Sequence, residues 1–318
     1  MNSLAEERRT PPASAALSAA PPHGAASAGK GAETSRTPAV EVRNLTVSYG
    51  PKPALLDVSL DVQPGTLVGI IGPNGGGKST FIKAVLGFVK KDMGQVRIQG
   101  VPTEKAKGLV AYVPQRGSVD WDFPVTVRQV AMMGRFGHVP WYREPGAEDK
   151  RIVDEALDMV RMGDFAGRQI GQLSGGQQQR VFMARALAQG ADILLLDEPF
   201  AGVDAATERA ILDVLDRART AGRTLVVVHH DLATAGEYFD MLALIKQRLY
   251  AYGPPSMVLR EDLLSEVYEG RLKIFSEIRT GGPANGVAPA QSPPEPPGPQ
   301  GTRKTRGTPG ESDGEGGR

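Results

Sequence analysis

The sequence contains no cysteine, which excludes disulfide bonds and thiolate metal sites. Aromatic residues are scarce as well, at 6% of 318 residues. The formal net charge of +1 gives no general attraction to nucleic acid, so a polyanion would need a local binding feature. No apolar run approaches the ~20 residues of a membrane span, and the N-terminus lacks the apolar core of a signal peptide. We therefore expect a soluble protein without a nucleic-acid partner.

Large apolar side chains are nearly missing from both ends of the chain. Residues 1–38 and 280–318 consist mainly of Ala, Pro, Gly, Ser and charged residues, a composition that cannot bury enough apolar surface to fold. We expect both tails to be disordered and their removal to leave activity intact. The remaining stretch, residues 39–279, is of a length that predicts one domain.

The order of predicted elements favours an α/β fold. Residues 40–50 and 54–65 alternate apolar and polar side chains and predict an antiparallel edge sheet. Buried strands then alternate with helices, which predicts a mainly parallel sheet covered on both faces, with a mostly helical insertion at about 116–172. The further predicted strands are residues 66–72, 95–100, 109–115, 192–199 and 224–231, and the predicted helices are residues 79–89, 126–134, 149–163, 177–190 and 205–222.

A glycine-rich stretch, GPNGGGKST, follows the first buried strand and precedes a helix. It fits G-x-x-x-x-G-K-[ST], in which backbone N–H groups surround phosphate oxygens and glycine permits their close approach. We expect Lys78 to reach the β- and γ-phosphates and Ser79 to ligate Mg²⁺. A flexible glycine turn is the alternative interpretation. The predicted phosphate-binding residues are Gly72, Pro73, Asn74, Gly75, Gly76, Gly77, Lys78, Ser79 and Thr80.

Two carboxylates follow a later buried strand, in ILLLDEP. Ligands of open α/β sheets bind at the carboxyl ends of the strands, so both side chains belong to the same region as the glycine-rich loop. Asp197 is predicted to bind Mg²⁺, and Glu198 to orient or deprotonate the attacking water. Without the phosphate loop, Asp-Glu-Pro after a strand would be interpreted as a turn.

The stretch LSGGQQQR opens a glutamine-rich helix at residues 173–180. A hydroxyl, free amides and a positive helix end suit an anion, although a simple capped helix start explains the same residues. In combination with the two motifs above, residues 39–275 resemble the nucleotide-binding subunit of an ATP-binding cassette (ABC) transporter. The resemblance implies a P-loop NTPase core of the RecA-like type and an ATPase that uses ATP and Mg²⁺.

The resemblance also implies roles for individual residues. Tyr49 looks like the aromatic residue that stacks on adenine, and Gln115 like the loop glutamine that touches Mg²⁺ and the attacking water. The histidine directly before Asp231 is the family's γ-phosphate switch, which selects His230 over its neighbour His229; a metal site formed by the two histidines is the weaker alternative. The residues that resemble contacts to ATP held by an opposite subunit are Ser174, Gly175, Gly176, Gln177 and Asp204.

The implied partners are a second copy of the chain, which forms an ATP-sandwich homodimer, and integral-membrane permease subunits. Residues 119–145 and VVVHHDL resemble the ATPases of manganese, zinc and iron importers, so we expect import of a divalent metal ion, first manganese, at the cytoplasmic face of the membrane. An extracytoplasmic metal-binding protein would take part indirectly. Zinc, iron or a metal chelate is the alternative cargo. A non-transport ABC ATPase is disfavoured, because each motif occurs once and no long coiled coil fits before the signature.

The stretch GRFGHVPWYREP, residues 134–145, concentrates aromatic and basic residues within the helical insertion. The resemblance places it on the face that receives the permease. Phe136, Trp141 and Tyr142 are therefore predicted either to pack within the insertion or to anchor a subunit contact. A metal site at His138 is disfavoured, because Asp120 and Asp122 are distant in sequence.

Overall fold

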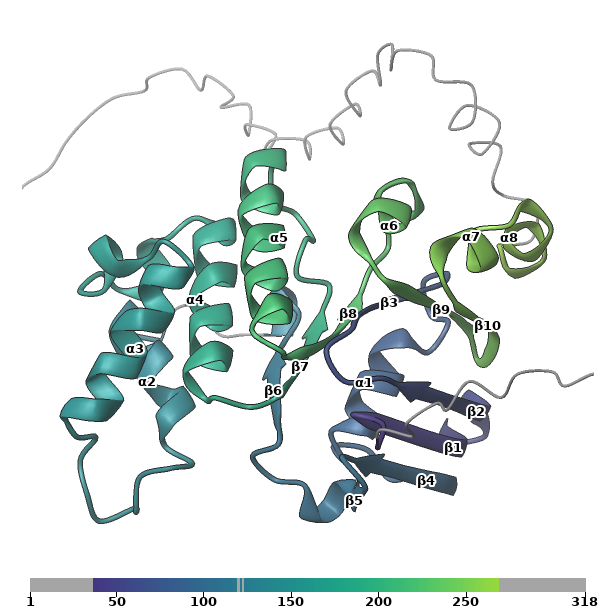
Figure 1. Cartoon of the computed structure of the whole chain (residues 1–318), viewed down its shortest axis with the longest axis horizontal. Coiled ribbons are helices and arrows are strands. Elements are labelled where there is room, and N and C mark those ends of the chain that lie inside the picture. Colours follow the sequence, from purple (N-terminus) through teal and green to yellow (C-terminus); the bar gives the residue numbers. More distant parts are fainter. Residues whose placement is uncertain (1–36, 119–120, 122, 269–318) are drawn as a thin grey trace, which may run out of the picture. The chain divides into compact units, whose positions relative to one another are not determined.

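Two sheets organise the fold (Figure 1), which a computed structural model describes for residues 37–118, 121 and 123–268. The predicted tails lie outside this range except for residues 37 and 38, and so does the expected end of the domain at 269–279. In the described part of the chain, no helix is long and apolar enough to cross a membrane.

The smaller sheet is antiparallel and has the strand order β2-β1-β4-β5. Its two long strands, β1 (Val40–Tyr49) and β2 (Lys52–Val62), pair in antiparallel register and confirm the predicted edge sheet. The sheet continues with β4 (Met93–Ile98) and the short β5 (Val101–Pro102). Alternating buried and exposed positions along β1 and β2 explain the alternating sequence, because only one face of this sheet is covered.

The larger sheet has the order β10-β9-β3-β8-β7-β6. All its neighbouring strands are parallel except the edge pair β9–β10. Every residue of β3, β7 and β8 is buried, as their continuous apolar sequences predict. The strands are β3 (Leu67–Ile71), β6 (Val110–Val113), β7 (Ile193–Asp197), β8 (Thr224–Val228), β9 (Met241–Lys246) and β10 (Arg248–Gly253).

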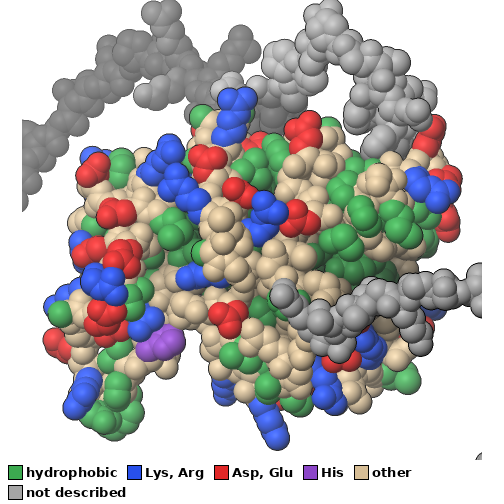
Figure 2. Space-filling model, in the orientation of Figure 1, with side chains coloured by type: hydrophobic (Ala, Val, Ile, Leu, Met, Phe, Trp, Pro, Cys, Tyr) green, Lys and Arg blue, Asp and Glu red, His purple; other side chains and the backbone are tan. Residues whose placement is uncertain are grey.

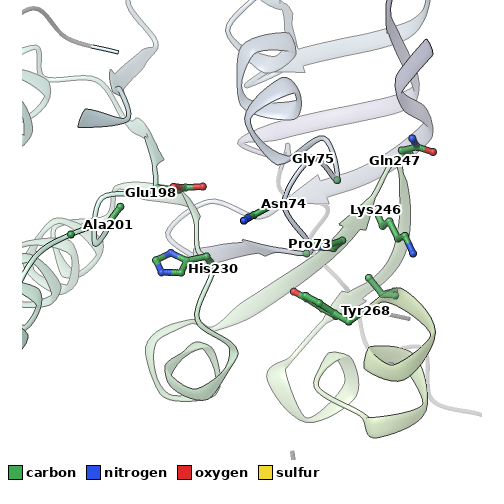
Figure 3. Close-up of a pocket in the computed structure, with 13 residues that line it drawn as sticks. Pro73, Asn74, Gly75, Glu198, Ala201, His230, Lys246, Gln247 and Tyr268 are labelled. Carbon is green, nitrogen blue, oxygen red and sulfur yellow. The ribbon is translucent and has the colours of Figure 1, made fainter. Parts of the chain in front are cut away.

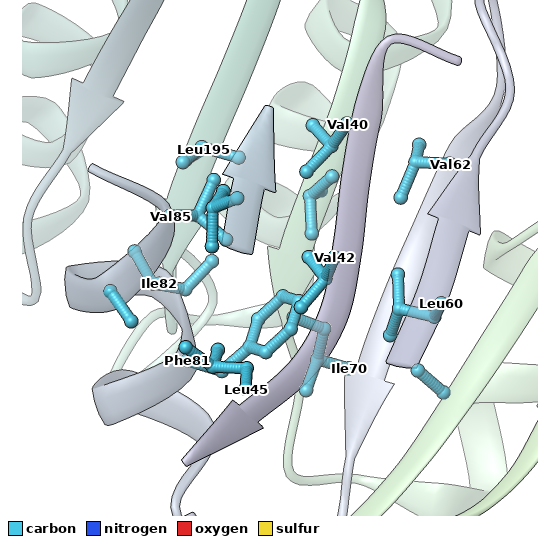
Figure 4. Close-up of a cluster of buried hydrophobic side chains, with 14 of the residues drawn as sticks. Val40, Val42, Leu45, Leu60, Val62, Ile70, Phe81, Ile82, Val85 and Leu195 are labelled. Atoms are coloured by element: carbon cyan, nitrogen blue, oxygen red, sulfur yellow. The ribbon is translucent and has the colours of Figure 1, made fainter. Parts of the chain in front are cut away.

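The main core lies where helix α1 (Lys78–Val85) packs between the two sheets. Figure 4 shows Phe81, Ile82 and Val85 of this helix among side chains of β1, β2, β3 and β7. Because α1 begins directly after the glycine-rich loop, burial of its apolar face fixes the loop at the edge of the sheet. Burying each such side chain contributes about 1.5–3 kcal/mol.

Three helices form a cluster beside the sheets: α2 (Val127–Met132), α3 (Ala147–Met159) and α4 (Gly175–Ala188) contact one another. The glutamine-rich helix α4 therefore packs with the predicted insertion. Helix α5 (Ala205–Thr220) packs on β8. The remaining helices are α6 (Leu232–Tyr238), α7 (Pro255–Val258) and α8 (Glu261–Val267), with short 3-10 turns η1 (Thr103–Lys105), η2 (Arg116–Ser118), η3 (Met133–Arg135), η4 (Gly163–Phe165) and η5 (Ile170–Gln172).

Two predicted helices end earlier than their apolar spacing indicates. Helix α1 stops at Val85 because Gly87 adopts φ = 72°, a left-handed conformation that ends helices, and its N–H donates to the Ala84 carbonyl. Helix α3 likewise ends at Met159, and Arg161 follows with φ = 57°. Periodicity alone cannot show these ends, since the apolar side chains beyond them are also used in packing.

Candidate active site

The glycine-rich loop joins β3 to α1 and is packed so closely that only glycine fits at its two ends. A Cβ atom on Gly72 would lie 2.0 Å from the Ile245 carbonyl oxygen, and one on Gly77 would lie 2.5 Å from the Ala54 carbonyl oxygen. Both glycines also have positive φ, 147° and 97°. The neighbouring strands β9 and β2 thus fix the loop from both sides.

Lys78 is buried and folds back over the loop that precedes it. Its Nζ donates hydrogen bonds to the carbonyl oxygens of Gly72, at 2.9 Å, and Pro73, at 3.0 Å. Burial lowers the pKa of Lys78, while Glu198 and Asp197 oppose this shift by favouring the charged form. The amine is therefore a buried cation next to two carboxylates, which suits the binding of a polyanion.

Ser79 and Asp197 bring two oxygen ligands together from α1 and the end of β7. The Ser79 hydroxyl donates to Asp197 Oδ1 at 3.0 Å. Asp197 is 3% exposed, and burial raises its pKa, whereas the hydrogen bond from Ser79 opposes the shift. A buried carboxylate beside a hydroxyl is the oxygen donor set that Mg²⁺ prefers, so these residues fit the expected ion.

Glu198 follows Asp197 and has an unusual backbone conformation, with φ = 51°. Left-handed conformations of residues other than glycine are uncommon and cluster at functional sites. Gln115, just beyond β6, donates from its Nε2 to Glu198 Oε2 at 2.8 Å. The loop after β6 and the end of β7 therefore meet through these two side chains.

Two cavities flank the glycine-rich loop. One, of about 530 Å³, joins the loop to the exposed Tyr49 of β1 and to Gln115 and Glu198. The other, of about 810 Å³, is lined by the start of the loop and includes Glu198 and His230 (Figure 3). Glu198 belongs to both cavities. The predicted loop residues that line at least one of them are Gly72, Pro73, Asn74, Gly75, Gly76, Gly77, Lys78, Ser79 and Thr80.

The two histidines after β8 have opposite environments. His230 is exposed and lines the larger cavity, whereas His229 is 1% exposed and its Nε2 lies 2.9 Å from Thr234 Oγ1. Burial lowers the pKa of His229 to about 4, so its ring is neutral at pH 7. Within the described ranges, no three His, Asp or Glu side chains come together as a metal site, so the two histidines gain no third protein ligand there.

The predicted signature residues form a second group, outside both cavities. Ser174 caps α4: its hydroxyl accepts from the Gln177 N–H, and the Gln177 side chain accepts from the Ser174 N–H. Asp204 caps α5, because its carboxylate accepts hydrogen bonds from the Thr207 N–H and the Thr207 hydroxyl. A Cβ on Gly176 would lie 2.5 Å from Thr207 Cγ2, so the two helix starts touch. The interpretation of residues 173–180 as a capped helix start is therefore correct for their local structure.

Several residues next to the glycine-rich loop were not predicted from the sequence. The β9–β10 turn supports the loop from behind, because Gln247 N–H donates to the Gly76 carbonyl oxygen at 2.7 Å and Lys246 lines the larger cavity. Val267 and Tyr268, at the end of α8, line the same cavity. These residues belong to no local motif; only the packing of distant strands brings them to the loop.

The aromatic stretch of residues 134–145 divides into a packed start and an exposed end. Gly134 contacts α4, since a Cβ there would lie 2.2 Å from the Arg185 carbonyl oxygen, and His138 Nε2 lies 2.8 Å from the Gln189 carbonyl oxygen. Phe136, Tyr142 and Trp141 are 58%, 69% and 96% exposed. Of the two predicted alternatives, packing within the insertion does not fit this exposure: the three side chains protrude on the η3–α3 loop, where Figure 2 shows hydrophobic side chains gathered at the lower left.

Comparisons with known proteins identify the family. A family model described as "ABC transporter" matches residues 55–201. The chain is 51% identical over 238 residues to the manganese transport system ATP-binding protein MntB of Bacillus subtilis, covering 75% of this chain and 95% of MntB. The chain belongs to the ABC transporter family. It is also 50% identical to the zinc transport system ATP-binding protein TroB of Treponema pallidum, covering 74% of this chain and 88% of TroB.

A solved structure supports the same assignment of the fold. The dimeric structure of MJ0796, a bacterial ABC transporter cassette, matches with a TM-score of 0.60 and 29% identity, covering 68% of this chain and 98% of that cassette. The predicted family, the P-loop α/β fold and the ATPase class are thereby confirmed for this ABC cassette. Binding of a nucleotide follows from the family.

Proposed function

We propose that this cassette hydrolyses ATP at the glycine-rich loop, with Glu198 as the residue that orients and activates water. The observation that supports this most strongly is the convergence of Lys78, Ser79, Asp197 and Glu198 at the carboxyl ends of β3 and β7. The loop N–H groups and Lys78 bind the β- and γ-phosphates, and the exposed face of Tyr49 stacks on adenine. Gln115 positions Glu198, and His230 contacts the γ-phosphate from the other side.

The proposed Mg²⁺ ligands are Ser79, Asp197 and Gln115. When bound with ATP, the ion would neutralise phosphate charge that builds up during hydrolysis. Asp197 holds the Ser79 hydroxyl in place before the ion arrives, because their hydrogen bond joins α1 to β7. Lys78 supplies a second positive charge without leaving the loop.

We further propose that two copies of the cassette act together. The loop residues and the signature residues of one chain lie in separate places, so Ser174, Gly175, Gly176, Gln177 and Asp204 would meet ATP held by the loop of a second copy. The dimeric MJ0796 cassette supports this arrangement. Glu198→Gln protein with ATP and Mg²⁺ should elute as a dimer in size-exclusion chromatography; a monomer would contradict the two-copy proposal.

The proposed cargo of the partner transporter is a divalent metal ion, and first manganese. The likeness to MntB supports manganese, and the likeness to TroB, at almost the same identity, makes zinc the second candidate. The ATPase itself would lie at the cytoplasmic face of the membrane on permease subunits, with an extracytoplasmic metal-binding protein delivering the ion. In a deletion strain, manganese content should fall more than zinc content; the opposite ranking would favour zinc.

Two described surfaces support docking of a permease. A groove of about 550 Å³ separates the end of α1 from η3 and α4, and exposed Phe88 and Met133 line it. Close by in sequence, Trp141 and Tyr142 protrude, with their rings at right angles and 5.9 Å apart. Exposed aromatic side chains of this kind are frequent anchors of protein interfaces. Co-purification of a polytopic membrane protein with the full-length chain tests this proposal, and weaker co-purification with Trp141→Ala would support it.

A further inference from the structure

His229 is enclosed by rings from two segments that meet beside the active site, one after β7 and one at the end of α6. The Phe200 and Phe239 ring centroids each lie 5.4 Å from that of His229, and the Tyr238 centroid lies at 6.0 Å. The imidazole is also tied to Thr234, whose Oγ1 is 2.9 Å from Nε2. Its backbone N–H donates to the Ile70 carbonyl oxygen at 2.9 Å, in the strand that leads into the glycine-rich loop.

These contacts involve the two segments that carry the proposed catalytic residues Glu198 and His230. Asp197 pairs with Val228 in the parallel register of β7 and β8, so Glu198 and His229 are the first residues beyond that pair. Phe200 then follows Glu198 by two positions, and it packs edge-on against His229, with an interplanar angle of 87°. On the other side, His230 follows His229 directly and points into the cavity that Glu198 lines.

We propose that His229 is a positioning residue: held by Thr234 and packed against Phe200, it sets where the β8–α6 turn places His230 relative to Glu198. This inference rests on the proposed function, because it assumes that His230 and Glu198 act on the same ATP. His229 itself contacts neither the loop nor the larger cavity through its ring.

The imidazole of His229 is an unusual side chain for a position enclosed by aromatic rings. Burial lowers the pKa of His229 to about 4, so it contributes a neutral imidazole. Nδ1 has no hydrogen-bond partner in the part of the chain that the structure describes, and burying an unpaired polar atom is unfavourable. A phenyl ring would fill the space without that penalty. The hydrogen bond to Thr234, which fixes the ring within the turn before α6, is the property that a phenyl ring lacks.

The test removes this hydrogen bond while keeping the shape of both residues. Thr234→Val and His229→Phe should each lower kcat for ATP hydrolysis by the full-length protein about 2- to 12-fold, the equivalent of one hydrogen bond, with little change in KM. The double variant should lose no more than either single variant, because both substitutions remove the same bond. His229→Gln, whose amide can reach Thr234, should recover part of the rate.

A matched control separates positioning from general loss of stability. Thr224, the first residue of β8, is buried, and its Oγ1 accepts a hydrogen bond from the Gly65 N–H at 3.0 Å, whereas Thr234 lies in α6 and is partly buried. Thr224→Val should lower the unfolding midpoint as Thr234→Val does, but leave kcat unchanged. Equal losses of kcat in the two variants would overturn the inference.

A His230→Ala protein tests whether Thr234→Val lowers the hydrolysis rate through His230. In His230→Ala protein, measured under single-turnover conditions, Thr234→Val should cause no further loss of rate. A wild-type kcat in Thr234→Val, or an equal fold-loss in both backgrounds, would overturn the positioning role while leaving the ATPase proposal intact. A wild-type kcat in His230→Ala would instead contradict the role proposed for His230, and the inference with it.

Discussion

Gln115 donates a 2.8 Å hydrogen bond to Glu198, and this contact joins the loop that enters the helical cluster to the proposed water-activating carboxylate. Glu198 has φ = 51°, which turns its side chain out of the strand direction of β7 and toward that loop. Movement of the helical cluster would therefore be felt at Glu198 through Gln115. Glu198 lines both cavities beside the glycine-rich loop.

Glu198→Gln should lower ATP turnover by about 100-fold or more, because the amide cannot accept a proton from water. ATP binding should persist, since the substitution keeps the shape of the side chain and the phosphate loop. Steady-state hydrolysis and equilibrium nucleotide binding measure the two effects separately. Glu155→Gln, on the exposed face of α3, is the control with the same chemical change and should behave as wild type.

His230→Ala should reduce turnover by about 100-fold, and His229→Phe by much less. The physical reason is that only His230 faces the cavity shared with Glu198, while His229 is enclosed. ATP turnover of the purified proteins at saturating ATP measures both losses. Similar losses in the two variants would refute the assignment of His230.

Removal of Mg²⁺ by EDTA should abolish hydrolysis, and Asp197→Asn should raise the Mg²⁺ concentration for half-maximal activity roughly tenfold or more. A carboxamide has no charge to offer the ion and forms a weaker hydrogen bond with Ser79. A titration of activity with Mg²⁺ at constant ATP measures this change. Asp213→Asn on α5 provides an exposed control.

The buried His229 predicts that stability falls between pH 6.5 and pH 4. The unfolded state takes up a proton below about pH 6.5, whereas the folded state resists protonation until about pH 4, so acidification favours unfolding. At pH 5 the difference amounts to about 2 kcal/mol. Urea unfolding of wild type and His229→Gln at pH 7.5 and pH 5 measures it; an identical pH dependence in both proteins would contradict the buried neutral state.

Trp141→Ala should leave ATP hydrolysis by the isolated cassette unchanged, because the side chain is 96% exposed and is not part of the buried core. The substitution should reduce transport by the assembled transporter, while ATP hydrolysis by that complex continues. Activity of the isolated subunit and of the reconstituted complex are the two measurements. Loss of hydrolysis in the isolated subunit would contradict the docking proposal.

The sequence predicts the sheet and the loop well because their determinants are local. Gly72 and Gly77 are required by the positive φ of the loop backbone, and the apolar run before Asp197 is required by a strand buried on both faces. Features that depend on tertiary packing cannot be predicted from the sequence in the same way. The exposure of Trp141 could not be predicted, because an aromatic residue on a loop is equally compatible with packing and protrusion.

The relation between the two histidines could be predicted only in part. Alternation along a strand indicates that His229 and His230 point to opposite sides, but not that one side is an aromatic enclosure. Phe200 comes from a segment distant in sequence, and the parallel register of β7 and β8 brings it to His229; Phe239 is nearer in sequence, at the end of α6, and the fold of that helix brings it back. Gln247, behind the loop, is likewise placed by strand pairing alone.

The most direct test of the account is the rate of manganese entry into cells that lack this chain. Wild-type protein supplied in trans should restore energy-dependent uptake of labelled manganese, and Glu198→Gln, at equal abundance, should not. Excess zinc should compete less well than unlabelled manganese. Equal uptake with Glu198→Gln, or no loss of uptake in the deletion strain, would contradict the proposal that ATP hydrolysis by this cassette powers manganese import.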